Sequence, residues 1–133
     1  MRLALGLGVA LTVSIVPVTS MAQAPPPPLL SETVQGMPKG ERQQVRVIEA
    51  AIPPGGMTPF HTHRFPVTVY VLEGTFTLEM EGLAPLTAKA GQAIVEPPMV
   101  RMTGYNRSTT EAMRVVIFYV SDPDTPFLDV AQH

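Results

Sequence analysis

The sequence contains no cysteine and no tryptophan, and only 6% of its 133 residues are aromatic. Without cysteine the chain forms no disulfide framework, no thiolate metal site and no cysteine nucleophile. Charged residues are also scarce: nine basic and eleven acidic residues give a net charge of −2, with no run of basic residues. Because nucleic-acid binding depends on dense neutralisation of phosphates, this composition argues against a nucleic-acid partner. The 45% of hydrophobic residues is enough for the core of one domain.

The first 22 residues have the layout of a secretory signal peptide. Arg2 provides a short positive region, and an uncharged, largely apolar run follows over residues 3–16. Ser20 and Ala22 then fit a small-residue cleavage site after residue 22. The apolar run is shorter than the about 20 residues that a membrane-spanning helix needs. We therefore expect an exported protein, periplasmic or secreted, without a stable membrane span after cleavage; an uncleaved membrane anchor is the alternative.

Turn residues divide the rest of the chain into short strands. We expect a Pro-rich linker and N-terminal arm over residues 23–43, a folded domain over 44–120 and an irregular C-terminal tail over 121–133. Within the domain, Gly or Pro recurs about every ten residues, and no stretch sustains a helical pattern. This spacing predicts an all-β domain, either an antiparallel sandwich or a small β-barrel. The predicted strands are residues 44–52, 66–72, 75–80, 86–89, 92–96, 100–106 and 113–120.

Two of the three histidines stand close together, as His61 and His63. In an extended chain alternate side chains point to the same face, so these two imidazoles share a face, with Cα atoms roughly 6.5–7 Å apart. Imidazoles at that spacing can bind one metal ion, and they suit zinc, copper, iron and nickel. For an isolated His-x-His pair, surface or packed histidines are the alternative.

The residues around this pair resemble the two sequence motifs of the cupin superfamily. The first motif is Gly, five residues, His-x-His, three or four residues, Glu, six residues, Gly. The second is Gly, five residues, Pro-x-Gly, two residues, His, three residues, Asn. The matching positions are Gly55, His61, His63, Gly74, Gly91, Pro97 and Asn106. The resemblance implies a cupin-type β-jelly roll that binds a metal ion or small ligand inside the barrel, with dioxygenase- or isomerase-type activity and a homodimer packed sheet to sheet.

The chain departs from these motifs at specific positions. The motif glutamate, a metal ligand in the family, maps to Val67, which cannot bind a metal. The second-motif histidine, also a ligand, maps to Met102, which can bind through its thioether, and the second-motif glycine maps to Met99. Of the four ligands that the resemblance implies, His61 and His63 remain.

The metal site predicted on this basis consists of His61, His63 and Met102, with Glu96, Tyr105 or water completing the shell. Two nitrogens and a thioether favour copper, particularly Cu(I), over iron or manganese, although another divalent transition metal stays open.

Other interpretations of the same residues stay open. For Met102, packing in the barrel interior is the alternative to metal binding. Glu96 lies either on an exposed rim or, if buried, beside a partner such as Arg64 or Arg101. Without a metal, the two histidines would serve a small organic ligand as hydrogen-bonding or acid–base groups. Two functions therefore remain open. The protein is either a metal-dependent enzyme or a non-catalytic metal- or small-molecule-binding protein whose metal site has been lost or converted to a soft copper site.

Overall fold

The structure, a computed structural model, describes residues 22–132. The predicted signal peptide therefore lies, except for its last residue, outside the described residues. Within the described range the chain forms strands and no helix, and so none long and apolar enough to cross a membrane. The strands are β1 (Gln44–Ile52), β2 (His61–Thr62), β3 (Val67–Glu73), β4 (Thr75–Met80), β5 (Leu86–Lys89), β6 (Ala93–Glu96), β7 (Met102–Tyr105), β8 (Met113–Ser121) and β9 (Asp129–Val130).

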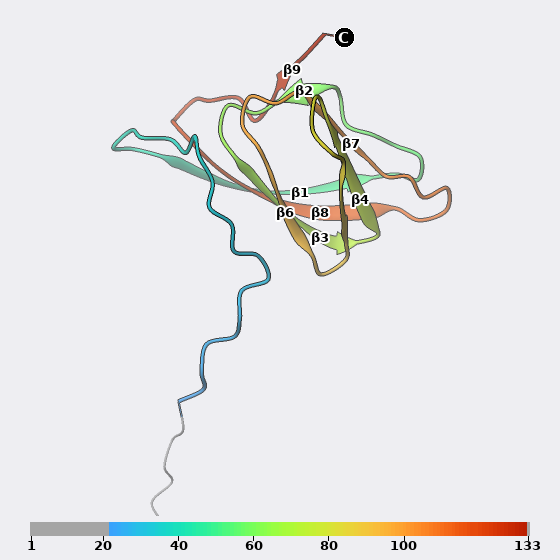
Figure 1. Cartoon of the computed structure of the whole chain (residues 1–133), viewed down its shortest axis with the longest axis horizontal. Coiled ribbons are helices and arrows are strands. Elements are labelled where there is room, and N and C mark those ends of the chain that lie inside the picture. Colours follow the sequence, from blue (N-terminus) through green and yellow to red (C-terminus); the bar gives the residue numbers. More distant parts are fainter. Residues whose placement is uncertain (1–21, 133) are drawn as a thin grey trace, which may run out of the picture.

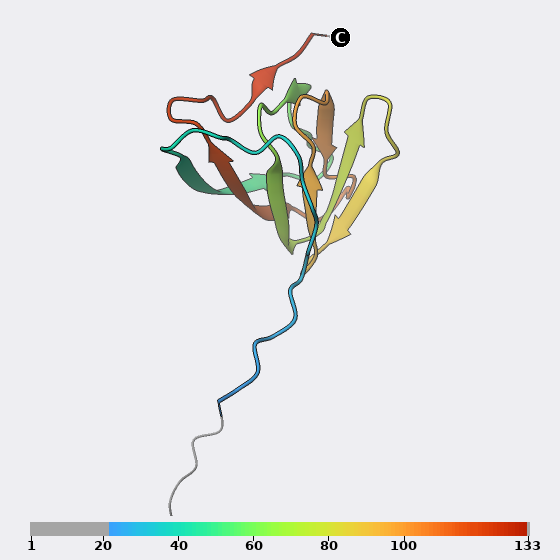
Figure 2. The same cartoon turned by 60° about the vertical axis from the view of Figure 1, so that its left-hand side comes forward.

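The strands form two antiparallel sheets that together enclose the core (Figures 1 and 2). One sheet has the order β1-β8-β3-β6 and the other the order β5-β4-β7-β2-β9. The chain passes repeatedly from one sheet to the other, which is the arrangement of a jelly roll. The predicted all-β jelly-roll fold is therefore confirmed, and all seven predicted strands are present, with ends shifted by two residues at most. The short strands β2 and β9 were not predicted.

The strand β3 shows why these residues form a barrel wall. Its side chains alternate between fully buried Val67, Val69 and Val71, which face the interior, and half-buried residues on the outer face. This period of two is that of a strand with one face on the core. The turn into β4 depends on Gly74, whose φ is +76° and where a Cβ atom would lie 3.0 Å from the Ala112 carbonyl oxygen.

The outer face of the β1-β8-β3-β6 sheet carries exposed apolar side chains. Val45 and Val47 of β1 lie directly opposite Val120 and Phe118 of β8, so all four share this face. The N-terminal arm crosses the sheet near β3 and β6 (Figure 2) and covers part of it. Val45, Val47 and Phe118 nevertheless stay exposed.

After β8 the chain turns back towards β2 (Figure 1), and we call residues 122–132 the C-terminal strap. Its strand β9 pairs with β2, although the sequence predicts no regular structure there. The strap is fastened at both ends: the Arg46 guanidinium donates to the Thr125 carbonyl at 2.8 Å, and Arg64 donates two hydrogen bonds to Asp129 at 2.8 and 3.0 Å. The strap is therefore part of the folded domain.

Candidate metal centre

His61 lies in β2, which pairs with β7 on one side and β9 on the other, and His63 directly follows this strand. Both side chains are buried, with 4% and 1% of their surfaces exposed. Their Nε2 atoms are 3.0 Å apart and the two rings are nearly perpendicular, at 81°. The two imidazoles thus point to one place inside the barrel, as the alternation of side chains in an extended segment predicts.

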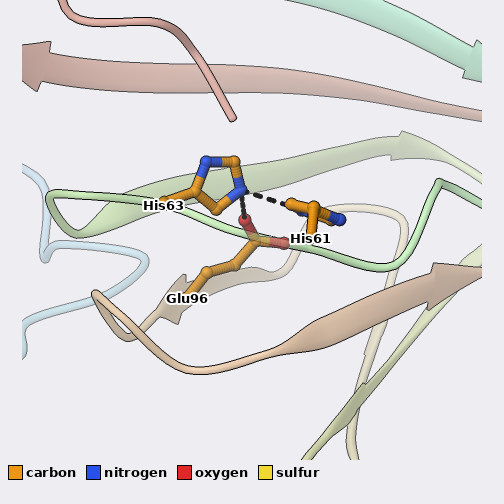
Figure 3. Close-up of side chains that lie close together, drawn as sticks. All are labelled: His61, His63 and Glu96. Atoms are coloured by element: carbon orange, nitrogen blue, oxygen red, sulfur yellow. Dashed lines mark hydrogen bonds and ion pairs between the residues drawn. The ribbon is translucent and has the colours of Figure 1, made fainter. Parts of the chain in front are cut away.

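Glu96, at the end of β6, completes a group of three (Figure 3). Its Oε2 atom lies 3.1 Å from His63 Nε2, its side chain is buried, and the ligand atoms of the three residues all lie within 4.8 Å of one another. Such a buried set of two histidines and one carboxylate can hold a metal ion. The partners expected for a buried Glu96 are engaged elsewhere, since Arg64 pairs with Asp129 and Arg101 with Glu81.

The carboxylate of Glu96 stands next to the position that the cupin motif assigns to glutamate. Glu96 is the direct cross-strand partner of Val67, where the motif has its glutamate. Directly opposite residues of an antiparallel pair have Cβ atoms about 4.5–5.5 Å apart on the same face. The neighbouring strand β6 therefore supplies the carboxylate that β3 lacks.

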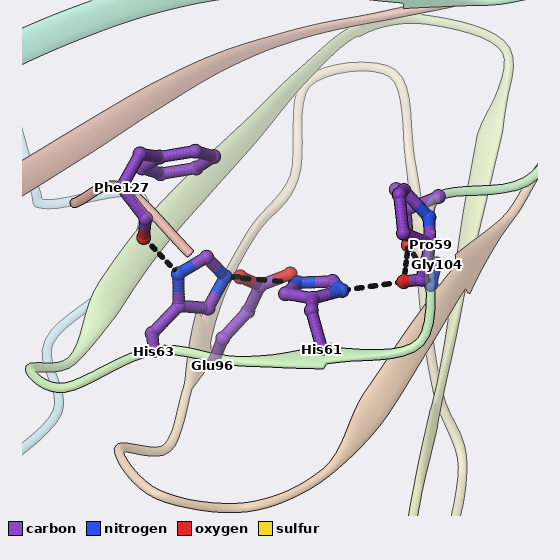
Figure 4. Close-up of polar contacts among 7 residues, drawn as sticks. Pro59, His61, His63, Glu96, Gly104 and Phe127 are labelled. Atoms are coloured by element: carbon purple, nitrogen blue, oxygen red, sulfur yellow. Dashed lines mark hydrogen bonds and ion pairs between the residues drawn. The ribbon is translucent and has the colours of Figure 1, made fainter. Parts of the chain in front are cut away.

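Backbone carbonyls set the tautomer that each imidazole has when it is neutral (Figure 4). His61 Nδ1 lies 2.6 Å from the Pro59 carbonyl oxygen, and His63 Nδ1 lies 2.6 Å from that of Phe127. Because a carbonyl oxygen only accepts, each Nδ1 carries a hydrogen and donates it, so a neutral ring has its lone pair on Nε2. In that tautomer the two Nε2 lone pairs face each other at 3.0 Å beside a carboxylate, an arrangement that a bound metal ion would stabilise.

Burial also favours the metal-binding form of His61. Desolvation lowers the pKa of its imidazole, the hydrogen bond to the Pro59 carbonyl partly opposes this, and the neighbouring His63 lowers the pKa further. A lowered pKa keeps the ring neutral, with a free lone pair, to more acidic pH than an ordinary histidine.

The other two predicted ligands take different positions. Met102 is fully buried and lies directly opposite His61, so its side chain is on the same face as that imidazole; its coordination of an ion stays a prediction. Tyr105 instead packs under the guanidinium of Arg107, 4.3 Å from the ring centroid, and lines a surface groove with Glu79. Tyr105 is therefore separate from the buried group.

The model of the cupin domain matches residues 48–119, a range that contains His61, His63, Glu96 and Met102. The chain belongs to the cupin family. The match spans more than half of the chain and ends before the C-terminal strap. No curated protein matches this cupin.

Solved structures with a similar fold come from several bacteria. A double-stranded β-helix protein from Klebsiella pneumoniae is 19% identical over 77% of this chain and 90% of its own, with a TM-score of 0.57. A cupin-like protein from Thermotoga maritima is 21% identical over 65% and 64%, with a TM-score of 0.55. The DMSP lyase DddQ from Ruegeria pomeroyi is 20% identical over 65% of this chain, with a TM-score of 0.57. This cupin spans only 43% of the lyase, and at these identities the likeness shows the fold alone.

A cavity of about 150 Å³ adjoins the three residues. Its other walls are mostly apolar side chains from both sheets, and the strap contributes two of them. The lining residues are Ala50, Ile52, Thr58, Pro59, His61, His63, Val69, Phe76, Glu96, Val115, Ile117, Phe127 and Leu128. The site therefore opens onto space for a small molecule.

The sequence pointed to some of this site and missed the rest. It identified the histidine pair, and it offered Glu96 only as one of several residues completing the shell. A signal for Glu96 was present, because it is the one charged residue in the predicted strand 92–96 and directly precedes the motif proline Pro97. The carbonyls of Pro59 and Phe127 are backbone groups that no residue type reveals.

Proposed function

We propose that this cupin binds a divalent transition-metal ion through His61, His63 and Glu96, with Met102 as a fourth ligand. The facing Nε2 lone pairs beside a buried carboxylate carry the proposal. Metal–nitrogen bonds of about 2.1 Å at right angles place two donors about 3.0 Å apart, whereas a tetrahedral ion needs about 3.4 Å. The observed spacing of 3.0 Å is near both values, so the two nitrogens can bind one ion.

Two histidines and one carboxylate with open coordination positions are the ligand set of non-haem iron(II) sites. A bound divalent ion would act as a Lewis acid towards a small molecule in the adjoining cavity. This combination favours an enzyme, of dioxygenase or isomerase type, over a protein that only stores metal. The protein contributes the tautomers of both imidazoles, which the carbonyls of Pro59 and Phe127 set.

Copper is the second candidate, because the buried thioether of Met102 faces the same side as His61. A thioether favours Cu(I), whereas the carboxylate of Glu96 favours a harder divalent ion. A metal-free site is the third: a proton shared by the imidazoles beside Glu96 would then serve a small organic ligand by acid–base action.

Titration of tag-free, metal-depleted protein with Fe(II), Co(II), Zn(II) and Cu(I) tests the proposal. We expect Co(II) to give a visible absorption spectrum, and Glu96→Gln, which keeps the size of the side chain, to lower Co(II) affinity at least about hundredfold. Glu81→Gln is the matched control, since this glutamate is exposed and paired with Arg101. His61→Ala should abolish most of the binding. Absence of Co(II) and Fe(II) binding by the wild type, with or without Cu(I) binding, would refute the divalent site.

We also propose that this cupin is exported and dimeric. Export rests on the layout of the first 22 residues, and amino-terminal sequencing of protein from the native host should give a chain that begins near Gln23. The dimer rests on the exposed apolar face around Val47 and Phe118. Recovery of the chain with Met1 intact in membranes would contradict export.

A further inference from the structure

The C-terminal strap belongs to the metal centre although it lies beyond the region that the cupin family model matches. That region ends at residue 119, whereas Phe127 and Leu128 line the cavity beside three of the four proposed ligands. Phe127 takes part in two ways. Its carbonyl oxygen accepts the hydrogen bond from His63 Nδ1, and its ring lies 4.8 Å from the His63 ring, centroid to centroid (Figure 4). The backbone of Phe127 thus positions a ligand, while its side chain forms a wall.

The ring of Phe127 packs edge-on against Tyr119, 5.6 Å between centroids, but polar contacts also hold the strap on both sides of it. Arg46 fastens one end through the Thr125 carbonyl, and the Arg64–Asp129 pair fastens the other. The pairing of β9 with β2 adds backbone hydrogen bonds beyond Phe127. A change of this side chain should therefore alter the cavity and leave the carbonyl that His63 uses.

The cavity wall sets the chemistry of what it can hold. Apart from the proposed ligands, the lining is aliphatic and aromatic except for Thr58, whose hydroxyl already accepts from Gly104 N–H and donates to the Pro59 carbonyl. No lysine or arginine is among the described residues that line it. A ligand's polar group consequently finds partners only at the metal centre. An apolar cavity of about 150 Å³ holds a molecule the size of benzene.

We infer that the metal centre binds a compact, largely apolar molecule of about six to eight non-hydrogen atoms with one oxygen donor, and that the Phe127 side chain sets its upper size. This inference rests on the metal site proposed above and adds the class of ligand. Larger ligands are excluded because the strap side chains Phe127 and Leu128 narrow the cavity, and polar ligands of the same size because the walls offer them no hydrogen bonds.

Phenol, 1-naphthol and glycerol test the inference as probes, in ligand-observed NMR and by their effect on the absorption of the Co(II)-loaded protein. The wild type should bind phenol and should bind neither 1-naphthol, which is too large, nor glycerol, which is similar in size to phenol but polar. Phe127→Ala should raise affinity for 1-naphthol at least about tenfold. Phe127→Trp should lower affinity for phenol by a similar factor, because the larger side chain reduces the volume of the cavity.

Tyr105→Ala is the matched control, because this ring packs against Arg107 and does not line the cavity, and it should leave all three affinities unchanged. Co(II) affinity, measured for every variant, separates a change of the cavity from a change of the metal site, and the control variant should stay within about threefold of the wild type. Failure of the wild type to bind Co(II) refutes the metal site itself. Co(II) binding together with equal affinities for phenol and 1-naphthol, or with probe affinities that neither Phe127 variant changes, overturns this inference alone.

Discussion

Replacing Met99 with glycine should stabilise this cupin. Met99 occupies the second-motif glycine position and has a φ of +62°, in the left-handed region that glycine adopts freely. A side chain in this conformation lowers the stability of the fold by roughly 1–2 kcal/mol. Glycine removes that strain, but it also makes the unfolded chain more flexible, which offsets about 0.5–1 kcal/mol of the gain. The Met99 side chain is 70% exposed, so its loss removes little burial. We expect the free energy of unfolding to rise by about 0.5–1 kcal/mol.

The backbone hydrogen bond of this turn should survive the substitution. Met99 N–H donates to the His63 carbonyl at 2.7 Å, and glycine keeps that donor. For a domain of this size the gain corresponds to an increase of about 2–6 °C in Tm. Thermal and urea unfolding of metal-free protein would measure it. Asp124→Gly is the matched control: Asp124 has a φ of +61°, but aspartate tolerates this conformation better, so its gain should be smaller. An unchanged or lower Tm for Met99→Gly would refute the strain argument.

Four further outcomes are expected. Gly74→Val should destabilise the domain by about 1–3 kcal/mol in urea unfolding, since valine is disfavoured at a φ of +76° and its Cβ would crowd a backbone oxygen; a neutral result would contradict the turn. Met102→His should strengthen Zn(II) or Ni(II) binding in titrations, whereas Met102→Leu should weaken Cu(I) selectively and spare the fold. The pKa of His61 is lower in the folded protein than in the unfolded chain, so the unfolded chain takes up a proton at higher pH. The free energy of unfolding of the metal-free protein should therefore fall as pH drops below about 6.5, and His61→Ala should make this pH dependence less steep. Phe118→Asp should convert the proposed dimer to monomer in analytical ultracentrifugation; a wild-type monomer would contradict the sheet-to-sheet dimer.

Local pattern explains which parts of this fold the sequence could predict. Strands such as β1 and β3 are long enough to show alternation and are bounded by Gly or Pro, so their positions followed from the sequence. The two-residue strands β2 and β9 are too short to carry a pattern, and only their pairing with each other and with β7 defines them.

The same distinction applies to the site. His61 and His63 are two residues apart, so their common face follows from the geometry of one extended segment. The role of Glu96 depends on the register between β3 and β6, and that of Phe127 on where the strap returns to the barrel. Both are long-range relations, set by packing of the whole chain, and no window of sequence contains them.

The pairing of Val67 with Glu96 bears on how a site of this kind changes during evolution. Two residues that face each other across neighbouring strands can supply the same chemical group, so an ancestor with glutamate at both positions would retain a carboxylate while either one mutated. A carboxylate at residue 96 can therefore take the place of the motif glutamate, whose position Val67 occupies. The double substitution Val67→Glu with Glu96→Val would move the carboxylate to the motif position, and retention of Co(II) binding would show that the two positions are interchangeable.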